Sequence, residues 1–436
     1  MNLILSTDSY KITHWKQYPP GAQHIYSYLE SRGGEFEKTL FFGLQYYLKE
    51  YFEGKVVTQE DIEEASQLCE MHFGQEVFNH DGWQRIVDVH GGRLPVSICA
   101  LPEGTISDVL TPLMTVENTD PELPWLTNHL ETLLSELWYP ITVATQSHFM
   151  KKTLLNHLEA TGTPADVSFK LHDFGFRGVS SPETSSIGGA AHLISFLGSD
   201  TMSALIMLRD YYNCDCAGFS IPATEHSTIT SWGEENEVHA FENVLKKFPT
   251  GIVACVSDSF DIFSACNDLW GTKLKSQVME RDGTLVIRPD SGDPVEVVLE
   301  CLRILGERFG YSLNAKRYKV LDPHVRLIQG DGIDHAMMKM ILNAMRTAGW
   351  SADNIAFGSG GALLQKLNRD TNQFAFKCSN ITVGSIDYPV FKNPVTAINK
   401  ISKKGRFDGL TEVFRDGVVL KECTLDEIRE RVENHR

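Results

Sequence analysis

Five short apolar runs between residues 167 and 361 end abruptly on residues that bind ions, phosphates or hydroxyl groups. The five endings are His172-Asp173-Phe174, Ser257-Asp258, Arg288-Pro289-Asp290, Gln329-Gly330-Asp331 and Gly358-Ser359-Gly360-Gly361. Carboxylates bind hydroxyl groups and divalent cations, arginine forks onto carbonyls and phosphates, and exposed glycine amides bind phosphate. Together these residues predict a site for a phosphorylated, hydroxylated ligand with a divalent metal ion. A sugar-phosphate isomerase or aldolase fits the spacing nearly as well.

Each ending also has a structural interpretation. In an extended chain Arg288 and Asp290 point to the same side, so they serve one ligand or form a mutual ion pair at the rim. The glycines at 358–361 predict a phosphate loop or a tight turn, and no Gly-Lys-Ser/Thr follows as in a P-loop. Asp331 lies in a flexible turn and, like Asp290, either contacts the ligand or has a structural role. Asp258 alone is typical of a helix N-cap.

His226 is a candidate base, nucleophile or phosphate carrier, and Glu225 beside it is placed to orient the ring. A lone histidine is more often structural. Outside the five endings, two groups of polar residues are candidates for ligand contacts or for plain solvated surface. They are Asp8, Tyr10, Lys11 and Arg32 near the N-terminus, and Lys392, Lys400, Lys403, Lys404 and Arg406 late in the chain.

The elements that position these residues follow from the apolar pattern. Runs that are apolar on both faces are typical of parallel strands covered by helices, and α/β barrels keep their chemistry at the carboxyl ends of such strands. Helices are expected at 294–309 and 334–348, between the endings. We therefore expect an α/β fold: an irregular (β/α) barrel-like domain over 161–380, with a doubly wound open sheet as the alternative. Residues 1–160 and part of 381–436 are expected to form a mixed α+β domain.

Composition excludes several classes of function. The 436-residue chain carries a net charge of −17, which argues against binding nucleic acid. The odd number of cysteines (nine) is typical of a reducing compartment. No signal-like N-terminus and no run of about 20 apolar residues is present. A cytoplasmic protein without membrane contact is expected.

Motifs along nearly the whole chain resemble the nicotinamide phosphoribosyltransferase family, a type II phosphoribosyltransferase family. The matching stretches are Thr7–Lys11, Lys16–Pro20, Val116–Pro121, Trp138–Thr145, Leu171–Gly175, Glu225–Thr230, Ile287–Gly292, Ile328–Gly332 and Ile355–Gly361. The resemblance implies an enzyme that joins nicotinamide to phosphoribosyl pyrophosphate in NAD salvage, giving nicotinamide mononucleotide and pyrophosphate. It also implies Mg²⁺, enhancement by ATP, and a homodimer with shared active sites.

The resemblance also implies roles for single residues. Phe174 would stack on one face of the nicotinamide ring, and Tyr10 of a second subunit on the other. Arg288 would contact the carboxamide oxygen and Asp200 its nitrogen. The other implied substrate contacts are Asp290, Gly330 and Asp331 for ribose; Gly360 and Gly361, with Arg369 and Lys377 of the second subunit, for the 5′-phosphate; Arg177, with Arg32, Lys392 and Lys400 of the second subunit, for pyrophosphate or ATP; and Asp8.

Four residues would carry the implied chemistry at the reacting centre, with metal and ATP. Asp258 and Asp290 would be the carboxylates on the Mg²⁺ side, acting through phosphate or water. ATP would be the co-substrate that phosphorylates His226. Arg288 would act with them at the reacting centre.

Two departures from the family pattern are visible. Ala375 stands where the family commonly has a serine near the 5′-phosphate, so one hydroxyl donor is absent, and the segment after Arg406 is short. No Asp-Asp pair occurs, in agreement with type II rather than type I enzymes. Nicotinate phosphoribosyltransferase and a non-catalytic sensor of nicotinamide mononucleotide remain alternatives.

Overall fold

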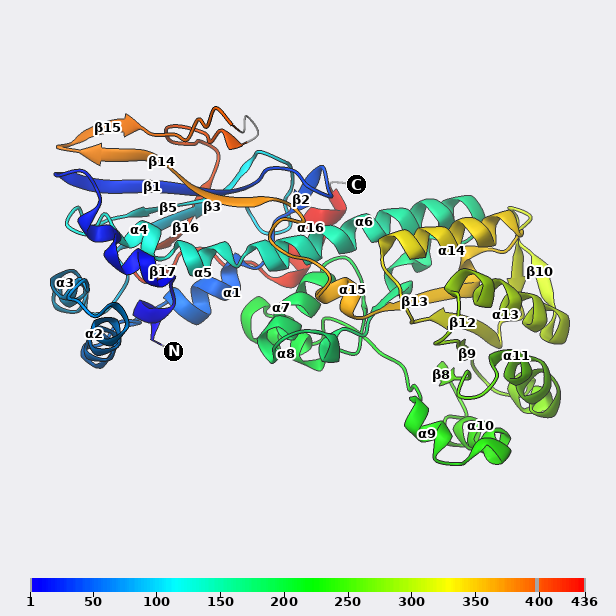
Figure 1. Ribbon diagram of the computed structural model, residues 1–436. Helices are drawn as coiled ribbons and strands as arrows, with labels where there is room; N and C mark the ends of the chain where they lie inside the picture. Colours follow the sequence, from blue (N-terminus) through cyan, green and yellow to red (C-terminus); the bar gives the residue numbers. More distant parts are fainter. Residues whose placement is uncertain (1, 397–399, 435–436) are drawn as a thin grey trace. The chain divides into compact units, whose positions relative to one another are not determined.

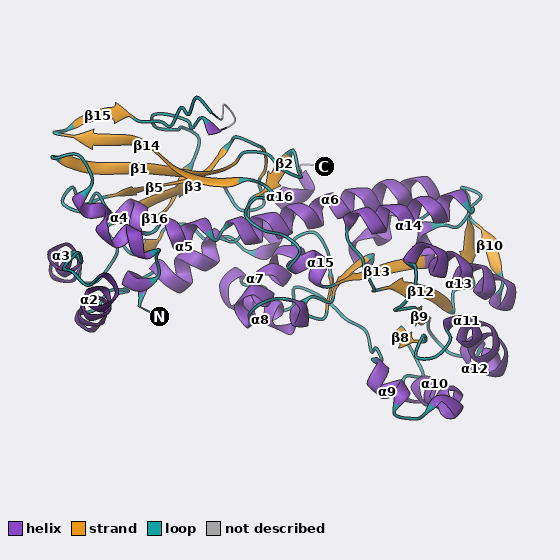
Figure 2. Cartoon of the chain, viewed as in Figure 1, coloured by secondary structure: helices purple, strands orange, loops and turns teal. Residues whose placement is uncertain are grey.

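The computed structural model describes residues 2–396 and 400–434, and the chain divides into two compact units (Figures 1 and 2). The first unit comprises residues up to 145, residues 210–214 and residues from 367 onwards. The second comprises residues 146–209 and 215–366. Helices α6 (Trp138–Thr161) and α8 (Met202–Tyr212) run across these divisions in sequence.

The first unit is built on a seven-stranded sheet whose neighbouring strands pair antiparallel. In spatial order the strands are β15 (Ile386–Pro389), β14 (Phe374–Val383), β1 (Ala22–Ser31), β5 (Pro112–Asn118), β3 (Val96–Ala100), β16 (Thr411–Arg415) and β17 (Val418–Val419). A separate pair joins β2 (Lys38–Leu40) to β4 (Ile106–Asp108). The long β1–β14 pairing binds residues from near the two ends of the chain into one sheet.

Short helices complete the first unit: α1 (Leu44–Tyr47), α2 (Gln59–Phe73), α3 (His80–His90), α4 (Leu126–His129), α5 (Glu131–Ser135) and α16 (Leu425–Asn434). The 3-10 helix Ser9–Lys16 carries Tyr10 and Lys11, Asp8 is its N-cap, and Arg32 directly follows β1. Thr58 and Asp61 form a reciprocal capping box at the start of α2.

The second unit is built on six parallel strands. Their order is β7 (Gly198–Ser199), β6 (Leu171–Asp173), β13 (Ile355–Ser359), β12 (Val325–Gln329), β9 (Leu285–Arg288) and β8 (Val253–Val256). Residues 219–223 join the two edges, because Phe219 bridges to Gly198 of β7 and Ala223 bridges to Ala254 of β8. The sheet therefore curls into an irregular barrel, which confirms the barrel-like α/β expectation over the open sheet.

Small and branched side chains fill the inside of this barrel. Ala254, Val286 and Ile328 come from three neighbouring strands and form one buried cluster. The Phe174 ring packs against the same cluster. The barrel is therefore a filled core, and ligands are confined to its mouth.

Helices alternate with the parallel strands, as the spacing predicted: α7 (Pro182–His192), α9 (His226–Thr230), α10 (Glu237–Lys247), α11 (Ile262–Ser264), α12 (Lys275–Met279), α13 (Pro294–Phe309), α14 (His335–Thr347) and α15 (Gly361–Leu364). A hairpin of β10 (Tyr311–Leu313) and β11 (Lys319–Leu321) follows α13. The predicted helices at 294–309 and 334–348 are confirmed; Asp293 and Asp334 are their N-caps.

Two details differ from the sequence expectations. The run at 167–171 was expected to be a strand, but Pro164–Phe169 forms a 3-10 helix and only Leu171–Asp173 is a strand. Proline at the first helical position fixes a φ that suits a helical turn. The unit divisions also fall elsewhere than 160 and 380, because β14 pairs with β1 and brings residues 374–380 into the first unit.

Candidate active site

A pocket of about 950 Å³ opens at the carboxyl ends of the parallel strands in the second unit. It is lined by predicted site residues from five different strand ends or the loops that follow them. These are Phe174, Arg177, Asp200, Arg288, Asp290, Gly330, Gly360 and Gly361. The structure thus brings together residues that are up to 187 positions apart in the chain, counting from Phe174 to Gly361.

Phe174 is held at the centre of the mouth by the backbone around it. Its N–H donates to the Ser359 carbonyl over 2.9 Å. The buried Asp173 carboxylate accepts a hydrogen bond from the Gly175 N–H over 2.7 Å and fixes the following turn. A Cβ on Gly358 would lie 2.0 Å from the Phe174 ring, so only glycine allows the ring to lie across the end of β13.

Asp200 is held at one oxygen by two donors. His172 Nε2 lies 2.9 Å from Oδ1, and the Ser220 hydroxyl donates to the same oxygen over 2.5 Å. Burial pushes the pKa of Asp200 upward, but the hydrogen bonds from His172 and Ser220 outweigh burial and keep the pKa below its ordinary value. Asp200 is therefore an ionised acceptor on the pocket wall.

Arg288 and Asp290 do point to the same side, as the extended geometry predicted. Arg288 Nη2 lies 3.7 Å from Asp290 Oδ2, while the buried Nε of Arg288 has no hydrogen-bond partner. Burial raises the pKa of Asp290; Arg288 opposes this rise, and the Asp258 and Asp331 carboxylates add to it. The ion-pair interpretation is thus correct in part, but the pair leaves donor capacity free for a ligand.

His226 and Asp258 form a second polar pair beside the pocket. His226 Nε2 lies 3.0 Å from Asp258 Oδ1, and the Ser291 hydroxyl donates to Asp258 Oδ2 over 2.6 Å. The His226 side chain is 46% exposed, whereas that of Asp258 is 4% exposed. The ring is therefore accessible to a ligand, and its carboxylate partner is fixed. Asp258 is not the cap of a helix: Asp261 caps α11 instead.

The glycine loop keeps a backbone amide open. Gly360 is the N-cap of α15, and a Cβ added to Gly178 would lie 3.2 Å from the Gly361 nitrogen. A side chain at 178 would cover this amide. Amides at a helix start bind phosphate, so an open amide here is compatible with the phosphate-loop interpretation.

The remaining candidates lie in the first unit. Tyr10 is 59% exposed, and its ring meets the His14 ring edge-on at 5.0 Å. The neighbouring Asp8 accepts a hydrogen bond from Thr132 over 3.0 Å, and the buried Lys11 pairs with Glu131 at 2.8 Å. These contacts fix the 3-10 helix, and the tyrosine ring stays exposed on it.

Basic residues from distant parts of the sequence gather along β1 and β14. Burial lowers the pKa of Lys377; the Glu131 carboxylate opposes this, and the nearby cations Arg32, Lys392 and Arg369 lower it further. The Ser402 N–H donates to the Lys392 carbonyl over 3.0 Å, and the Lys392 N–H donates to the Ser402 hydroxyl over 2.8 Å, which closes a loop that contains Lys400. The predicted phosphate-binding residues Arg32, Arg369, Lys377 and Lys392 therefore form one cationic cluster.

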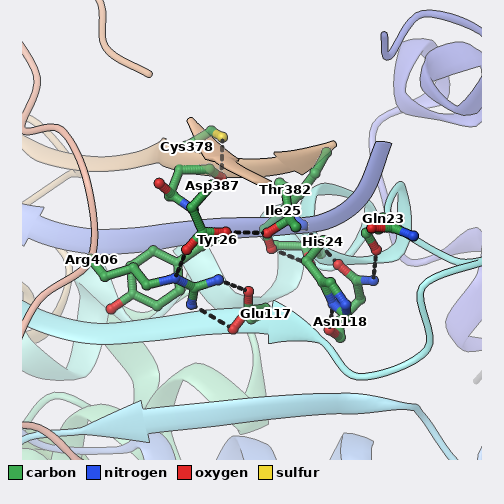
Figure 3. Close-up of polar contacts among 12 residues, drawn as sticks. Gln23, His24, Ile25, Tyr26, Glu117, Asn118, Cys378, Thr382, Asp387 and Arg406 are labelled. Atoms are coloured by element: carbon green, nitrogen blue, oxygen red, sulfur yellow. Dashed lines mark hydrogen bonds and ion pairs between the residues drawn. The ribbon is translucent and has the colours of Figure 1, made fainter. Parts of the chain in front are cut away.

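The base of this loop is clamped by Arg406. Its guanidinium forks onto both carboxylate oxygens of Glu117, donates to Asp387 over 3.0 Å, and lies 4.9 Å from the centre of the Tyr26 ring (Figure 3). Next to it, the Lys403 N–H donates to the Tyr28 hydroxyl over 2.8 Å. Arg406, for which the sequence left ligand contact and solvated surface open, thus fastens the loop to β1, β5 and β15.

Some residues of the site were not singled out by the sequence. His172 was visible in its motif but had no assigned role, and Ser220 and Ser291 carried no signal beyond their position near strand ends. Both serines are brought to their carboxylates by the barrel, over 20 and 33 positions of sequence.

No group of three or more His, Cys, Asp or Glu side chains that could hold a metal ion occurs in residues 2–396 and 400–434. Asp258 and Asp290 lie near enough for the charge of Asp258 to raise the pKa of Asp290. Two carboxylates suit Mg²⁺, which commonly takes its other ligands from water and phosphate. Within the same residues, no helix is long and apolar enough to span a membrane.

The barrel and its mouth define an α/β-barrel protein with a polar pocket at the carboxyl ends of its parallel strands. Residues 169–431 match the nicotinate phosphoribosyltransferase (NAPRTase) family, and residues 2–98 match the N-terminal domain of nicotinamide phosphoribosyltransferase. The chain therefore belongs to the nicotinate phosphoribosyltransferase family.

Relatives are similar over almost their full length. A nicotinamide phosphoribosyltransferase of Xanthomonas campestris is 48% identical, with 98% of this chain and 97% of the relative covered. Those of Acinetobacter baylyi and Mycoplasma pneumoniae are 32% and 31% identical, covering 99% and 93% of this chain and 97% and 95% of theirs.

Two solved structures share the fold at 15% identity, both with a TM-score of 0.58. One is nicotinate-nucleotide pyrophosphorylase from Pyrococcus furiosus, with 100% of this chain and 95% of that chain covered. The other is human nicotinic acid phosphoribosyltransferase, with 98% and 93% covered.

Proposed function

We propose that this protein transfers the phosphoribosyl group of phosphoribosyl pyrophosphate to nicotinamide, giving nicotinamide mononucleotide and pyrophosphate in NAD salvage. The observation that supports this most is the ionised Asp200 carboxylate in one pocket with Phe174 and Arg288. An aromatic face, an arginine and an anionic acceptor suit a ring that bears a carboxamide. The names of the relatives support the same substrate.

The reaction breaks the bond between the ribose C1 and a pyrophosphate oxygen, and the ring nitrogen of nicotinamide forms the new bond to C1. The electron pair of the broken bond leaves with pyrophosphate, so no protein nucleophile is required. Positive charge develops on the ribose, and the Asp290 and Asp331 carboxylates stabilise it. The amides of Gly360 and Gly361 hold the 5′-phosphate, and Arg177 meets the pyrophosphate.

Asp258 and Asp290 are the residues that would hold Mg²⁺ at the pocket, with water and phosphate completing its ligands. When bound, it supplies positive charge to the leaving pyrophosphate. Asp290 keeps the second task of contacting ribose.

The active form is proposed to be a homodimer with shared sites. Tyr10 of the second subunit closes the ring site opposite Phe174. The cationic cluster of that subunit, with Lys400 and Asp8, completes the phosphate site.

ATP is the proposed co-substrate for His226. With Nε2–H donating to Asp258, the ring keeps its lone pair on Nδ1. Attack of this nitrogen on the γ-phosphorus breaks the bond to the bridging oxygen, and ADP leaves. The phosphohistidine adds negative charge near the pyrophosphate site.

The function is tested by mixing purified protein with phosphoribosyl pyrophosphate, Mg²⁺ and either nicotinamide or nicotinate, and measuring both mononucleotides by chromatography. Formation of nicotinamide mononucleotide in preference to the nicotinate product is expected. Preference for nicotinate would identify a nicotinate phosphoribosyltransferase. No mononucleotide, with or without ATP, together with tight binding of nicotinamide mononucleotide, would identify a sensor.

A further inference from the structure

We infer that His172 and Ser220 are positioning residues that set the preference for a neutral carboxamide over a carboxylate, by fixing the ionised Asp200 carboxylate at its Oδ1 oxygen. The inference rests on the proposed function and deepens it. Neither residue needs to touch the substrate for this role.

The positions of all three residues follow from the barrel's register. Strands β6 and β7 pair His172 with Gly198 and Asp173 with Ser199, and the Asp200 N–H donates to the Asp173 carbonyl over 2.9 Å. Asp200 therefore directly follows the short strand β7 and lies beside His172 of β6. Its backbone does not depend on the side chain of His172.

Ser220 reaches Asp200 through the segment that closes the barrel. The Phe219 N–H donates to the Leu197 carbonyl over 2.7 Å, and the Ser199 N–H donates to the Phe219 carbonyl over 3.1 Å. These two hydrogen bonds place residue 220 next to residue 200. The closure of the barrel thus delivers a hydroxyl donor to the specificity carboxylate.

The His172 ring is held on three sides. A Cβ on Gly198 would lie 2.6 Å from Nδ1, so the ring fits only over a glycine. The ring centre is 5.2 Å from that of Phe174, with 55° between the planes. The remaining nitrogen, Nε2, faces Asp200, and it donates in either the Nε2–H tautomer or the protonated form. The His172 ring therefore contacts both the Phe174 ring and the Asp200 carboxylate.

Two donors on one oxygen have a chemical consequence. Hydrogen bonds to a carboxylate stabilise its charged form, and because both donors meet at Oδ1, the Oδ2 lone pairs are left for a ligand. An ionised acceptor binds the N–H groups of a carboxamide and repels a carboxylate. The Asp200 side chain is 47% exposed, so without these donors it would rotate and protonate more readily.

The test compares His172→Phe and Ser220→Ala with the wild type. Each removes one donor and keeps the size of the side chain similar; His172→Gln restores an N–H donor. His239→Gln and Ser276→Ala change exposed residues that do not line the pocket and are the matched controls. The ratio of kcat/KM for nicotinamide to kcat/KM for nicotinate is measured, together with the Kd of each compound by calorimetry.

A charge-assisted hydrogen bond contributes enough for roughly a tenfold change in this ratio. We expect that loss for His172→Phe and Ser220→Ala, mainly through KM, with partial recovery in His172→Gln and no change in the controls. The charged groups acting on Asp200 are His172 and Arg288. The nicotinamide-to-nicotinate ratio should fall at pH values low enough to protonate Asp200. Because loss of the His172 or Ser220 donor makes Asp200 easier to protonate, this fall is expected to begin at a higher pH in the variants.

An unchanged kcat/KM ratio and pH profile in both His172→Phe and Ser220→Ala would overturn the inference, since a structural role alone would lower kcat/KM for both substrates equally. Failure of the proposed function is distinguishable. If the wild type forms no mononucleotide, the Kd ratio for nicotinamide and nicotinate still tests the positioning role. An equal Kd ratio in wild type and variants would then overturn it.

Discussion

His226 Nε2 lies 3.0 Å from Asp258 Oδ1, and this pair couples an exposed imidazole to a nearly buried carboxylate. Asp258 is itself held by the Ser291 hydroxyl at its other oxygen. A carboxylate fixed in this way selects the tautomer of the ring and stabilises the cation that forms when the ring reacts. The same arrangement lies next to Asp290, so a change of charge on His226 is felt at the substrate site.

We expect His226→Ala to abolish the enhancement by ATP while leaving ATP-independent transfer measurable. The reason is that the proposed phosphate acceptor is lost but the pocket lining is not. The measurement is mononucleotide formation with and without ATP, combined with phosphohistidine detection after incubation with labelled ATP. His239→Ala, on the exposed face of α10, is the control. Intact enhancement in the His226 variant would refute the phosphocarrier role.

Asp200→Ser is expected to weaken the use of nicotinamide and to relax the rejection of nicotinate. The serine hydroxyl accepts and donates, so it removes both the favourable acceptor and the repulsive charge. Mismatched buried polar groups change kcat/KM by orders of magnitude, and a change of roughly tenfold or more in the ratio is expected. Unchanged relative kcat/KM for the two substrates would show that Asp200 does not discriminate between them.

A third prediction addresses the shared site. Tyr10 lies in the first unit and Phe174 in the second, and each is proposed to serve opposite faces of one ring. Homodimers of Tyr10→Ala and of Phe174→Ala should both be impaired at both sites. Mixed dimers should regain one intact site when subunits exchange, so activity should rise on mixing.

Subunit exchange must be verified by tagging the two variants separately and isolating the mixed dimer. Mixing either variant with itself is the control. No recovery of activity in the isolated mixed dimer would mean that Tyr10 and Phe174 do not act across subunits.

How far the sequence predicts this molecule depends on the kind of contact. The strand endings are local, so Arg288, Asp290 and the glycines at 358–361 were placed correctly at the barrel mouth. The capping aspartates at 293 and 334 follow the same logic, because their partners lie within three residues. Local patterns of this kind need no knowledge of the tertiary fold.

Contacts that depend on strand register were not predictable. Ser220 reaches Asp200 only because Phe219 pairs with Gly198 to close the barrel, and residues 219–223 form isolated bridges rather than an apolar strand. The segment after β14 was equally hard to predict. Its lysines, such as Lys392, lie in a polar stretch that is typical of solvated surface, and only the β1–β14 pairing brings this segment near Arg32 and Lys377.

Arg406 provides the last prediction, because its role depends on that pairing. Its fork onto Glu117 and its contact with Asp387 fasten the base of the loop that contains Lys400 (Figure 3). Arg406→Ala is expected to raise the KM for phosphoribosyl pyrophosphate several-fold, because the loop lysines lose their fixed position, and to lower stability by about 1–2 kcal/mol. Arg406→Lys keeps the charge but not the fork, so most of the effect on KM should remain.

Arg303 is a matched control for this variant. It also pairs with two carboxylates, Glu300 and Glu307, but on the exposed surface of α13. Exposed pairs on a helix contribute about 0.3–0.5 kcal/mol each, so Arg303→Ala should leave KM unchanged and the urea midpoint nearly so. If Arg406→Ala and Arg303→Ala behave alike in both measurements, the Arg406 contacts are ordinary surface ion pairs. The loop is then positioned by Lys403 alone, which bonds Tyr28 through its N–H and lies 3.8 Å from the Glu30 carboxylate through its ammonium group.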